Sequence, residues 1–538
     1  MKKTMKRHSL ITRLASLAVV CGLTLAFASC ANDDLAQNGK TSTDDKGLTA
    51  FSTGEPATRT TMEADGKFYW EAGDKIWVKD DSGNWKQSSN SPTGKTASFK
   101  FLMPGKYTAK SSYEVYYPGK NGNKDKVTIS ANQTQTEPNT TAHFGASGDC
   151  GIAKATRNAT SHEFEFALDH KAAYLVFKPY TNDDILKHCY LTKIEVTSDN
   201  DITTTSTYTY TLDPTADTGA GALTGTGNGK QIVLETKGSG AYTNGFPLTN
   251  TSANLTTNGA YMVIKPGTHT LRIRYWVKDV ATNIEGTITK IIPSHTFAKN
   301  EYVNMEADLQ IKNYDGDHYY MWDAQNQYWY GYEWTKNLPT GIGQPTLDSN
   351  SSSNYPQSNT DSRYYNESYP GNGVSNPATH APCKDLPNAN EMSWYCMYGD
   401  PRWDADELWT TMGHLYKGGM WFKKKSVLQA EGHYDTEKSA DNTTDLRTTY
   451  KYYNNSNSSI YNSGLPSAAD AGNYFYLPAL GTYLSGSLYD NVGNRGHYWS
   501  SSAYPQASGY AYRLCIADGY VYVYMLNRYY GCRVDGFE

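Results

Sequence analysis

YAYRLCIADGYVYVYML, residues 510–526, predicts a β-hairpin, because Asp518-Gly519 separates two runs of aromatic and β-branched residues. A two-residue turn there gives three cross-strand pairs on one face: Ile516 with Val521, Leu514 with Val523, and Tyr512 with Met525. The opposite face then carries Arg513, Cys515, Tyr522 and Tyr524. The register is self-consistent, and it predicts that the chain ends in β-sheet.

The first half of the chain carries the same kind of pattern. Short alternating segments occur at residues 68–70, 75–79, 164–168, 170–177, 261–265 and 271–277. Turn residues separate several of them, such as Ala72-Gly73-Asp74 and Pro266-Gly267. Strands of this length with hardly any helical periodicity indicate β-sandwiches.

Two short helices are expected in the second half. The first covers residues 386–398. The second begins near Asp404, which would cap it, and places Leu408, Trp409 and Met412 at helical spacing. In that setting Asp404, Asp406 and Glu407 form the solvated start of a helix, and an acid–base role is the weaker reading. The stretch from 337 to about 382 is expected to be a long polar loop.

The N-terminus carries an export signal. Lys2, Lys3, Lys6 and Arg7 precede an apolar run that ends in LAFASC at residues 25–30, and this run is too short to span a bilayer. Small residues just before a cysteine suit a lipoprotein signal peptidase. We therefore expect cleavage before Cys30 and a lipid on its thiol. The CANDD stretch at 30–34 resembles the acidic signal that follows the lipidated cysteine of Bacteroidetes lipoproteins, and the resemblance implies an address on the outer surface of the outer membrane. An ordinary secretory signal that happens to contain a cysteine is the weaker alternative.

Composition narrows the classes of function. The mature chain of about 500 residues is long enough for two or three domains. The formal net charge is −5 and no basic stripe appears, which argues against a nucleic-acid partner. Tyrosine is the outlier, with 45 copies, and it suits both sheet scaffolds and surfaces that contact other molecules.

Cysteine usage permits disulfides but does not choose among them. Of eight cysteines, Cys21 and Cys30 belong to the leader, which leaves Cys150, Cys189, Cys383, Cys396, Cys515 and Cys532. No CxxC pair occurs, so the spacing argues against zinc. The sequence contains no Ser/His/Asp pattern, HExxH motif or phosphate loop, and we expect neither a cofactor nor a metal and no enzymatic activity.

Four stretches in the first half resemble the fimbrillin-like (Mfa-like) family of Bacteroidales surface proteins. They are TRT at 58–60, WEAGDKI at 70–76, FALDHKAA at 166–173 and TFAKNEY at 296–302, in the family's order. The resemblance implies two consecutive transthyretin-like β-sandwiches with a boundary near residue 180. His170 would be a structural residue at the start of a strand.

The same resemblance implies a mechanism of assembly. Such pilins travel as lipoproteins until a trypsin-like protease cuts after an arginine, removes the first strand and opens a groove that another subunit's strand fills. Arg59, followed by Thr60, stands at a suitable place for the cut. A solvated, uncut Arg59 is an equal alternative.

The second half resembles the major-paralogous-domain proteins, a branch with a C-type-lectin-like fold. The matching stretches are YLPALG at 476–481, HYWSSS at 497–502 and NRYYGCRV at 527–534, within residues 380–538. Trp499 would be a core residue. The sugar-binding motifs of calcium-dependent lectins are absent, and analogy with lectin folds implies a disulfide between Cys396 and Cys532.

These expectations combine into one domain plan. It has a signal peptide at 1–29, a flexible tether at 30–50, β-sandwiches at 51–180 and 181–312, and an α+β C-type-lectin-like domain at 313–538. The leading hypothesis is a fimbrial tip or accessory adhesin that accepts a strand from another pilin subunit and binds a glycan or protein of host or bacterial origin. The alternative is a lipid-anchored, glycan-binding surface lipoprotein outside any pilus, and an oxidase-type enzyme ranks third.

Overall fold

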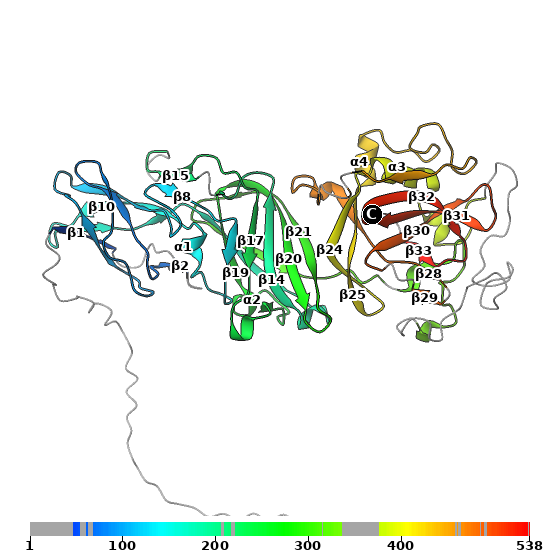
Figure 1. Ribbon diagram of the computed structural model, residues 1–538, viewed down its shortest axis with the longest axis horizontal. Coiled ribbons are helices and arrows are strands. Elements are labelled where there is room, and N and C mark those ends of the chain that lie inside the picture. Colours follow the sequence, from blue (N-terminus) through cyan, green and yellow to red (C-terminus); the bar gives the residue numbers. More distant parts are fainter. Residues whose placement is uncertain are drawn as a thin grey trace, which may run out of the picture. The chain divides into compact units, whose positions relative to one another are not determined.

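A computed structural model describes residues 47–53, 61–62, 68–205, 209–216, 221–314, 316–335, 376–457, 460, 464–484, 486–488, 492–535 and 537. Over these residues the protein is mainly β, as the sequence predicted (Figure 1). Residues Thr49–Glu538 form one compact unit. The predicted lipidation site Cys30, the predicted cleavage site at Arg59 and Thr60, and most of the expected polar loop lie outside the described residues.

An eight-stranded sheet forms the first part of the fold. Its path runs β5-β4-β7-β10-β11-β1-β6, and β12 pairs with β10. The members are β1 (Leu48–Thr53), β4 (Trp77–Lys79), β5 (Trp85–Gln87), β6 (Lys100–Pro104), β7 (Ser112–Tyr117), β10 (Gly151–Arg157), β11 (Phe164–Phe166) and β12 (Asp169–His170). A core of aromatic and aliphatic side chains, which includes Phe51, Trp70 and Phe164, packs against it.

The WEAGDKI stretch builds a buried turn beside this core. Trp70 is fully buried and lies edge-on to Phe101, with ring centroids 4.9 Å apart. The buried Asp74 carboxylate accepts hydrogen bonds from the Glu71 amide at 2.7 Å and from the Tyr117 hydroxyl at 2.9 Å. Gly73 has φ +84°, which explains why glycine stands in this turn.

A nine-stranded sheet and a three-stranded sheet follow. The larger runs β27-β25-β24-β21-β20-β14-β17-β9, with β18 beside β14, and the smaller runs β19-β13-β22. Their bounds are β9 (Asn132–Thr134), β13 (Ala173–Tyr180), β14 (Tyr190–Ser198), β17 (Gln231–Glu235), β18 (Phe246–Pro247), β19 (Ala260–Ile264), β20 (Gly267–Asp279), β21 (Ile284–Phe297), β22 (Tyr302–Asp308), β24 (Arg402–Thr411), β25 (His414–Lys423) and β27 (Tyr474–Pro478). One continuous core joins their buried side chains from Ala173 to Leu415.

His170 lies in β12 at the start of this region, as the resemblance implied. It is buried, and its Nδ1 lies 2.8 Å from the Asp149 carboxylate. The Tyr174 hydroxyl donates to the same carboxylate at 2.5 Å. The three side chains form a buried hydrogen-bonded group that links β12 and β13 to the segment just before β10.

The C-terminal sheet has six strands in the order β23-β33-β30-β31-β32-β26. They are β23 (Tyr319–Tyr320), β26 (Tyr453–Asn455), β30 (Arg495–Ala503), β31 (Tyr510–Ala517), β32 (Tyr520–Asn527) and β33 (Cys532–Arg533). The hairpin prediction is confirmed residue for residue: Ile516 pairs with Val521, Leu514 with Val523, and Tyr512 with Met525. Trp499 is fully buried, as predicted, and its indole nitrogen donates to the Tyr320 carbonyl at 2.8 Å.

Smaller elements complete the fold. Three minor sheets are β16-β15-β8, β2-β3 and β28-β29. Their strands are β2 (Thr61–Met62), β3 (Phe68–Tyr69), β8 (Lys126–Val127), β15 (Tyr210–Asp213), β16 (Ala222–Thr224), β28 (Tyr483–Leu484) and β29 (Ser487–Leu488). The helices are α1 (Phe144–Ser147), η2 (Leu186–His188), η3 (Gly240–Tyr242), α2 (Leu255–Asn258), η4 (Gly316–His318), η5 (Glu333–Thr335), η6 (Cys383–Asp385), α3 (Ala389–Tyr398), α4 (Lys425–Ala430) and η7 (Ala471–Asn473). None of the helices among the described residues has the length and apolar content that crossing a bilayer requires.

Of the two helices expected in the second half, one is confirmed and one is wrong. Helix α3 begins at a capping box, in which the Asn388 side chain accepts from the Glu391 amide and the Glu391 carboxylate accepts from the Asn388 amide. The segment after Asp404 is instead strand β24, which pairs with β21 on one side and β25 on the other. Met412 and Gly413, with φ +50° and +76°, make the hairpin turn between β24 and β25, so the apparent helical spacing of Met412 is accidental.

The predicted disulfide between Cys396 and Cys532 is also wrong. All six described cysteines are free and buried. Cys396 packs in the core beneath α3, where its thiol donates to the Val521 carbonyl at 3.4 Å, whereas Cys532 lies in a separate cluster with Trp499. Tyr498 belongs to the first cluster and Trp499 to the second, so the sheet itself separates the two thiols.

Candidate functional site

The first strand occupies an internal position in the eight-stranded sheet. β1 lies between β11 and β6, and it is parallel to β11 with Phe51 opposite Phe164 and Thr53 opposite Phe166. On its other side the Thr53 amide donates to the Phe99 carbonyl at 3.2 Å. Main-chain hydrogen bonds therefore hold β1 from both sides, although it is the first strand of the chain.

Phe51 is the side chain that anchors β1. It is fully buried, and its ring stacks on Phe164 with centroids 4.9 Å apart and planes 19° apart. The rings of Tyr107 and Tyr113 meet it edge-on at 5.2 Å and 6.4 Å. Burying a phenylalanine contributes about 1.5–3 kcal/mol, so one side chain supplies much of the apolar contact of a six-residue strand.

Polar contacts on both faces of β1 fix its register. The Ser52 hydroxyl donates to the Glu163 carboxylate at 2.5 Å, and the Phe99 amide donates to the Thr53 hydroxyl at 2.9 Å. Although partial burial opposes it, hydrogen bonds from Lys100 and Ser52 lower the pKa of Glu163. Glu163 is therefore ionised at neutral pH and accepts from Ser52 as a carboxylate.

The arrangement of β1 can serve strand exchange. Its contacts are main-chain hydrogen bonds, one buried aromatic side chain and the hydroxyls of Ser52 and Thr53, which a strand with a matching apolar residue and polar neighbours can reproduce. Residues 54–60, which follow β1 in sequence, contain the predicted cleavage site Arg59-Thr60. A cut there severs β1 from all later strands, since β2 begins at Thr61.

Strand β22, which ends the first half of the chain, is paired with a neighbouring strand along its whole length. β22 pairs in parallel with β13 from Tyr302 opposite Tyr174 to Asp308 opposite Tyr180. Met305 and Ala307 of β22 are buried in the central core. The chain then continues through Leu309 and Ile311, which are buried in the same core, into the C-terminal sheet region.

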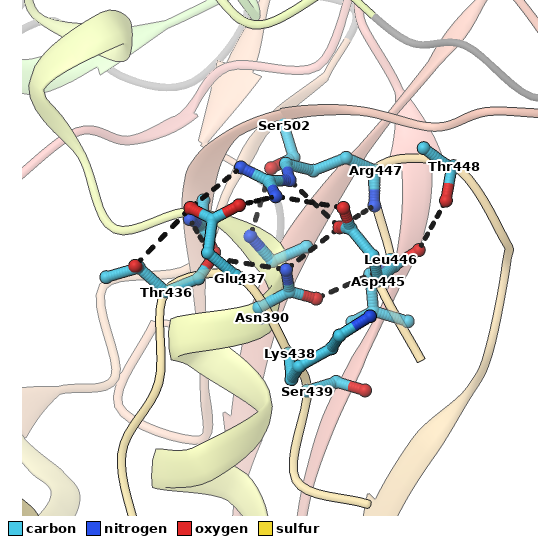
Figure 2. Close-up of polar contacts among 12 residues, drawn as sticks. Asn390, Thr436, Glu437, Lys438, Ser439, Asp445, Leu446, Arg447, Thr448 and Ser502 are labelled. Atoms are coloured by element: carbon cyan, nitrogen blue, oxygen red, sulfur yellow. Dashed lines mark hydrogen bonds and ion pairs between the residues drawn. The ribbon is translucent and has the colours of Figure 1, made fainter. Parts of the chain in front are cut away.

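The second region of interest is a polar loop over α3 (Figure 2). Arg447 lies between two carboxylates: its guanidinium donates to Asp445 Oδ2 at 2.8 Å and to Glu437 Oε2 at 2.5 Å. Asn390, from α3, donates to Asp445 Oδ1 at 2.9 Å and accepts from the Leu446 amide at 2.9 Å. The guanidinium and the amide together fix the loop on the helix.

A neighbouring carboxylate in this loop is neutralised in the same way. Asp441 accepts from Lys451 Nζ at 2.7 Å, from the Thr444 hydroxyl at 2.6 Å and from the amides of Thr443 and Thr444. Although desolvation opposes it, these hydrogen bonds together lower the pKa of Asp441 far below its usual range. The acidic groups of this loop are thus paired with side chains of the chain itself.

The cysteines and the other metal-binding residue types offer no site for metal or thiol chemistry within the described residues. Within the described part of the chain, no three His, Cys, Asp or Glu side chains cluster in a way that could hold a metal ion. Burial raises the pKa of Cys515, and it raises the pKa of Cys532 to about 12. Neither thiol is ionised near neutral pH, which disfavours a reactive cysteine pair of the oxidase type.

All three carboxylates lie on strand β24 rather than on a solvated helix start: Asp404 and Glu407 lie in a hydrogen-bonded network, whereas the partly exposed Asp406 pairs with Lys417 at 3.2 Å. Asp404 accepts from Arg274 Nη2 at 2.8 Å and from the Trp421 indole at 3.0 Å. Glu407 accepts from the Thr289 amide at 3.0 Å and from the Thr289 hydroxyl at 2.6 Å. Burial, followed by the Asp404 charge, raises the pKa of Glu407 to about 7, against the opposing hydrogen bonds of Thr289.

Sequence reasoning missed two features of these regions. Leu48-Thr49-Ala50 fell within the stretch expected to be a tether, yet they begin β1, because the strand has only one deeply buried aromatic residue to signal it. The half-exposed tyrosines Tyr450 and Tyr452 were not singled out either. They precede a three-residue edge strand, β26, which is too short to show alternation.

Among the comparisons with known proteins, only the one with solved structures gives matches. No model of a protein family matches the chain, and no curated protein matches it. Among solved structures, a candidate cell adhesion protein from Bacteroides uniformis is 15% identical, covers 49% of this chain and 93% of its own, and has a TM-score of 0.27. The fimbrial anchor protein Mfa2 from Porphyromonas gingivalis is 10% identical, covers 46% of this chain and 83% of its own, and has a TM-score of 0.21.

A third solved structure spans more of the chain. A fimbrial protein from Bacteroides ovatus is 10% identical, covers 89% of this chain and 99% of its own, and has a TM-score of 0.23. The structural neighbours are thus cell adhesion and fimbrial proteins.

Proposed function

We propose that the chain is a non-enzymatic component of a surface fimbria, which accepts a strand from another subunit in place of β1 and presents its C-terminal domain for binding. The observation that carries the proposal is the position of β1. It is an internal strand held by Phe51, and it precedes the Arg59-Thr60 peptide bond in the sequence. A single cut can therefore free the strand without removing any later element.

The proposed sequence of events begins at the membrane. The lipid on Cys30 brings the chain to the outer surface of the outer membrane. A trypsin-like protease then cuts between Arg59 and Thr60, and β1 leaves with the lipidated segment. The vacated position exposes the main-chain groups of β11 and β6 and the ring of Phe164, to which an incoming strand with an apolar side chain can bind.

A terminal position in the fimbria follows from the other end of the first half. Strand β22 is paired with β13, is buried at Met305 and Ala307, and continues into the C-terminal sheets. It is not free to leave for another subunit. A subunit that accepts a strand but does not donate one belongs at a tip, with its C-terminal domain directed outward.

An Arg59→Ala substitution tests strand acceptance. Stalk subunits should co-purify with the wild-type chain from cells and should be lost, by about tenfold or more, from the Arg59→Ala chain. Thr60→Ser keeps the arginine and serves as the matched control, which should retain the stalk subunits. Unchanged association of the Arg59→Ala chain would argue against exchange of β1.

The alternative is a glycan-binding lipoprotein outside any pilus, whose mature form retains Cys30 and β1. The buried Phe51 and the paired edges of β1 are compatible with this role too, because an uncut strand completes the sheet. The two functions differ in the mature N-terminus: Thr60 in the fimbrial component and lipidated Cys30 in the lipoprotein.

A further inference from the structure

The outer face of the C-terminal sheet carries a row of tyrosine rings, which we call the tyrosine face: Tyr450, Tyr452, Tyr520, Tyr522 and Tyr524. The last three alternate along β32, so their side chains leave the sheet on one side, while Val521 and Val523 enter the core on the other. Tyr450 and Tyr452 come from the chain just before β26, the edge strand beside β32.

The rings of this face touch one another. Tyr452 meets Tyr524 with centroids 5.1 Å apart and Tyr522 with centroids 6.0 Å apart. Tyr522 stacks on Tyr520 at 5.7 Å with planes 19° apart. Tyr450 joins through Tyr504, whose ring lies 6.1 Å from Tyr450 and 6.2 Å from Tyr524. The result is continuous aromatic surface.

Much of this aromatic surface is open. Tyr450 is 48% exposed and Tyr452 is 49% exposed, and Tyr520, Tyr522 and Tyr524 are partly exposed. Asn454, which is exposed and opposite Tyr522 in the neighbouring strand, adds a polar amide to the same face. Contiguous exposed aromatic surface of this kind marks a contact site more often than scaffold.

Two arginines lie against the tyrosine rings. The Arg513 guanidinium lies 5.0 Å from the Tyr522 ring centroid, and the Arg495 guanidinium lies 5.7 Å from that of Tyr520. Arg513 donates to His497 Nδ1 at 3.0 Å, to the Tyr522 hydroxyl at 3.0 Å and to two main-chain carbonyls of β32. All of these partners are neutral groups.

The positive charge of this face is not compensated within the described chain. Neither Arg495 nor Arg513 forms an ion pair with a carboxylate of the described residues, and Arg513 is only 6% exposed. His497 accepts from Arg513 as a neutral ring, because burial, then Arg513 and Arg495, holds the pKa of His497 well below its ordinary value. Two uncompensated cations on one face attract anions.

From this juxtaposition we infer that the tyrosine face binds an anionic glycan, a chain of sugar rings that carries carboxylate groups. The apolar faces of sugar rings stack on the exposed tyrosines, the hydroxyl groups hydrogen-bond to the tyrosine hydroxyls and Asn454, and the carboxylates lie in the field of Arg495 and Arg513. The surface differs from the loop over α3, whose carboxylates are already paired with Arg447 and Lys451.

An acidic peptide fits this surface less well. Peptides bind to sheets by pairing with an edge strand or by filling a groove with side chains. Here the tyrosine rings of β32 stand on the flat side of the sheet. They are not part of the sheet edge, which the neighbouring strand β26 forms. The inference rests on the proposed function, since it names the class of ligand that the C-terminal domain would present.

The test uses the full-length chain, extracted from membranes in detergent and applied to immobilised polygalacturonate. Its methyl ester has the same sugar rings without the charge, and poly-glutamate has the charge without the sugars. We expect binding to polygalacturonate that is at least about tenfold tighter than to either control polymer and that weakens as salt rises from about 50 to 300 mM. Equal binding to the methyl ester, equal binding to poly-glutamate, or binding to none of the three would each overturn the inference.

Variants assign the binding to this surface. Tyr452→Ala combined with Tyr450→Ala should reduce affinity about tenfold or more, and Arg495→Gln should reduce it about fivefold and flatten the salt dependence. Tyr330→Ala is the matched control, because Tyr330 is 46% exposed elsewhere on the chain, and it should leave affinity unchanged. Circular dichroism and melting temperature confirm that each variant is folded. Unchanged affinity in the folded tyrosine double variant would place the site elsewhere.

Failure of this inference is distinguishable from failure of the proposed function. The Arg59→Ala chain should bind polygalacturonate as the wild type does, because the substitution leaves the C-terminal sheet untouched. Loss of stalk subunits with retained glycan binding would support both strand exchange at β1 and glycan binding at the tyrosine face. Retained stalk subunits would count against strand exchange alone, and absent glycan binding would count against the tyrosine face alone.

Discussion

At the scale of single residues, Phe51 carries the attachment of β1. Its ring contacts Phe164, Tyr107 and Tyr113 and is fully buried. Replacing it with alanine removes those contacts and leaves a cavity, because the surrounding rings belong to other segments of the chain and do not collapse onto the gap.

Phe51→Ala should therefore destabilise the first sheet by about 3–5 kcal/mol. We expect a lower urea midpoint for the uncleaved chain, together with faster proteolysis after Arg59. Val280→Ala is the control, since Val280 is 43% exposed and should change stability by less than about 0.5 kcal/mol. A Phe51→Ala chain as stable as the control would show that β1 is held by its main chain alone.

The raised pKa of Glu407 leads to a second prediction, which concerns the dependence of stability on pH. Burial and the charge of Asp404 raise its pKa to about 7 from a reference value of 4.5. Between about pH 4.5 and 7 the folded state keeps a proton that the unfolded state has lost, so the stability that this group contributes falls as the pH rises through that window. Above about pH 7 both states are ionised and the destabilisation is constant.

Glu407→Gln should abolish this dependence. The amide oxygen still accepts from Thr289 and the amide group carries no charge, so we expect the melting temperature at pH 8 to rise by about 1–4 °C, with little change at pH 4. Differential scanning calorimetry at both pH values measures the effect, with Glu306→Gln, at an exposed side chain, as control. The same pH profile in Glu407→Gln and wild type would contradict the assignment of the raised pKa to this group.

At the scale of elements, the hairpin β31–β32 depends on its turn. Gly519 has φ +88°, which a β-branched residue adopts only with strain. Gly519→Val should lower the free energy of unfolding by about 1–2 kcal/mol in urea titrations and should weaken binding at the tyrosine face, because β32 carries three of its rings.

Gly509→Val is the matched control for the turn. Gly509 precedes β31, is not restricted to positive φ and has open space around its Cα, so valine is tolerated there. Equal unfolding free energies for Gly519→Val and Gly509→Val would mean that the turn does not limit the stability of the hairpin.

The elements that sequence reasoning placed correctly are those specified by neighbours in the chain. The Asp518-Gly519 turn acts over two residues and was predicted, and so was the helix that begins at the capping box of Asn388 and Glu391, although the capping box itself was not. Strand β24 was mistaken for a helix because its pairing with β21 joins Glu407 to Thr287, far away in sequence, and because the local Met412-Gly413 turn to β25 was not recognised. The Cys396–Cys532 bridge came from analogy, and the sheet that separates the thiols could not be inferred from their spacing.

At the scale of the whole molecule, the two ends of the chain differ in what they can do. The first strand is held by contacts that another strand can reproduce, whereas β22 is committed to the core and to the connection with the C-terminal sheets. The C-terminal sheet presents the tyrosine face and its two arginines. The domain plan, the lipid on Cys30 and the cut at Arg59 remain predictions from the sequence.

The mass of the mature chain isolated from intact fimbriae tests the central claim most directly. We expect an N-terminus at Thr60, with the lipidated fragment that contains β1 absent and a strand from another subunit bound in its place. A mature chain that begins at lipidated Cys30 and retains β1 would contradict strand exchange and would support the surface lipoprotein instead.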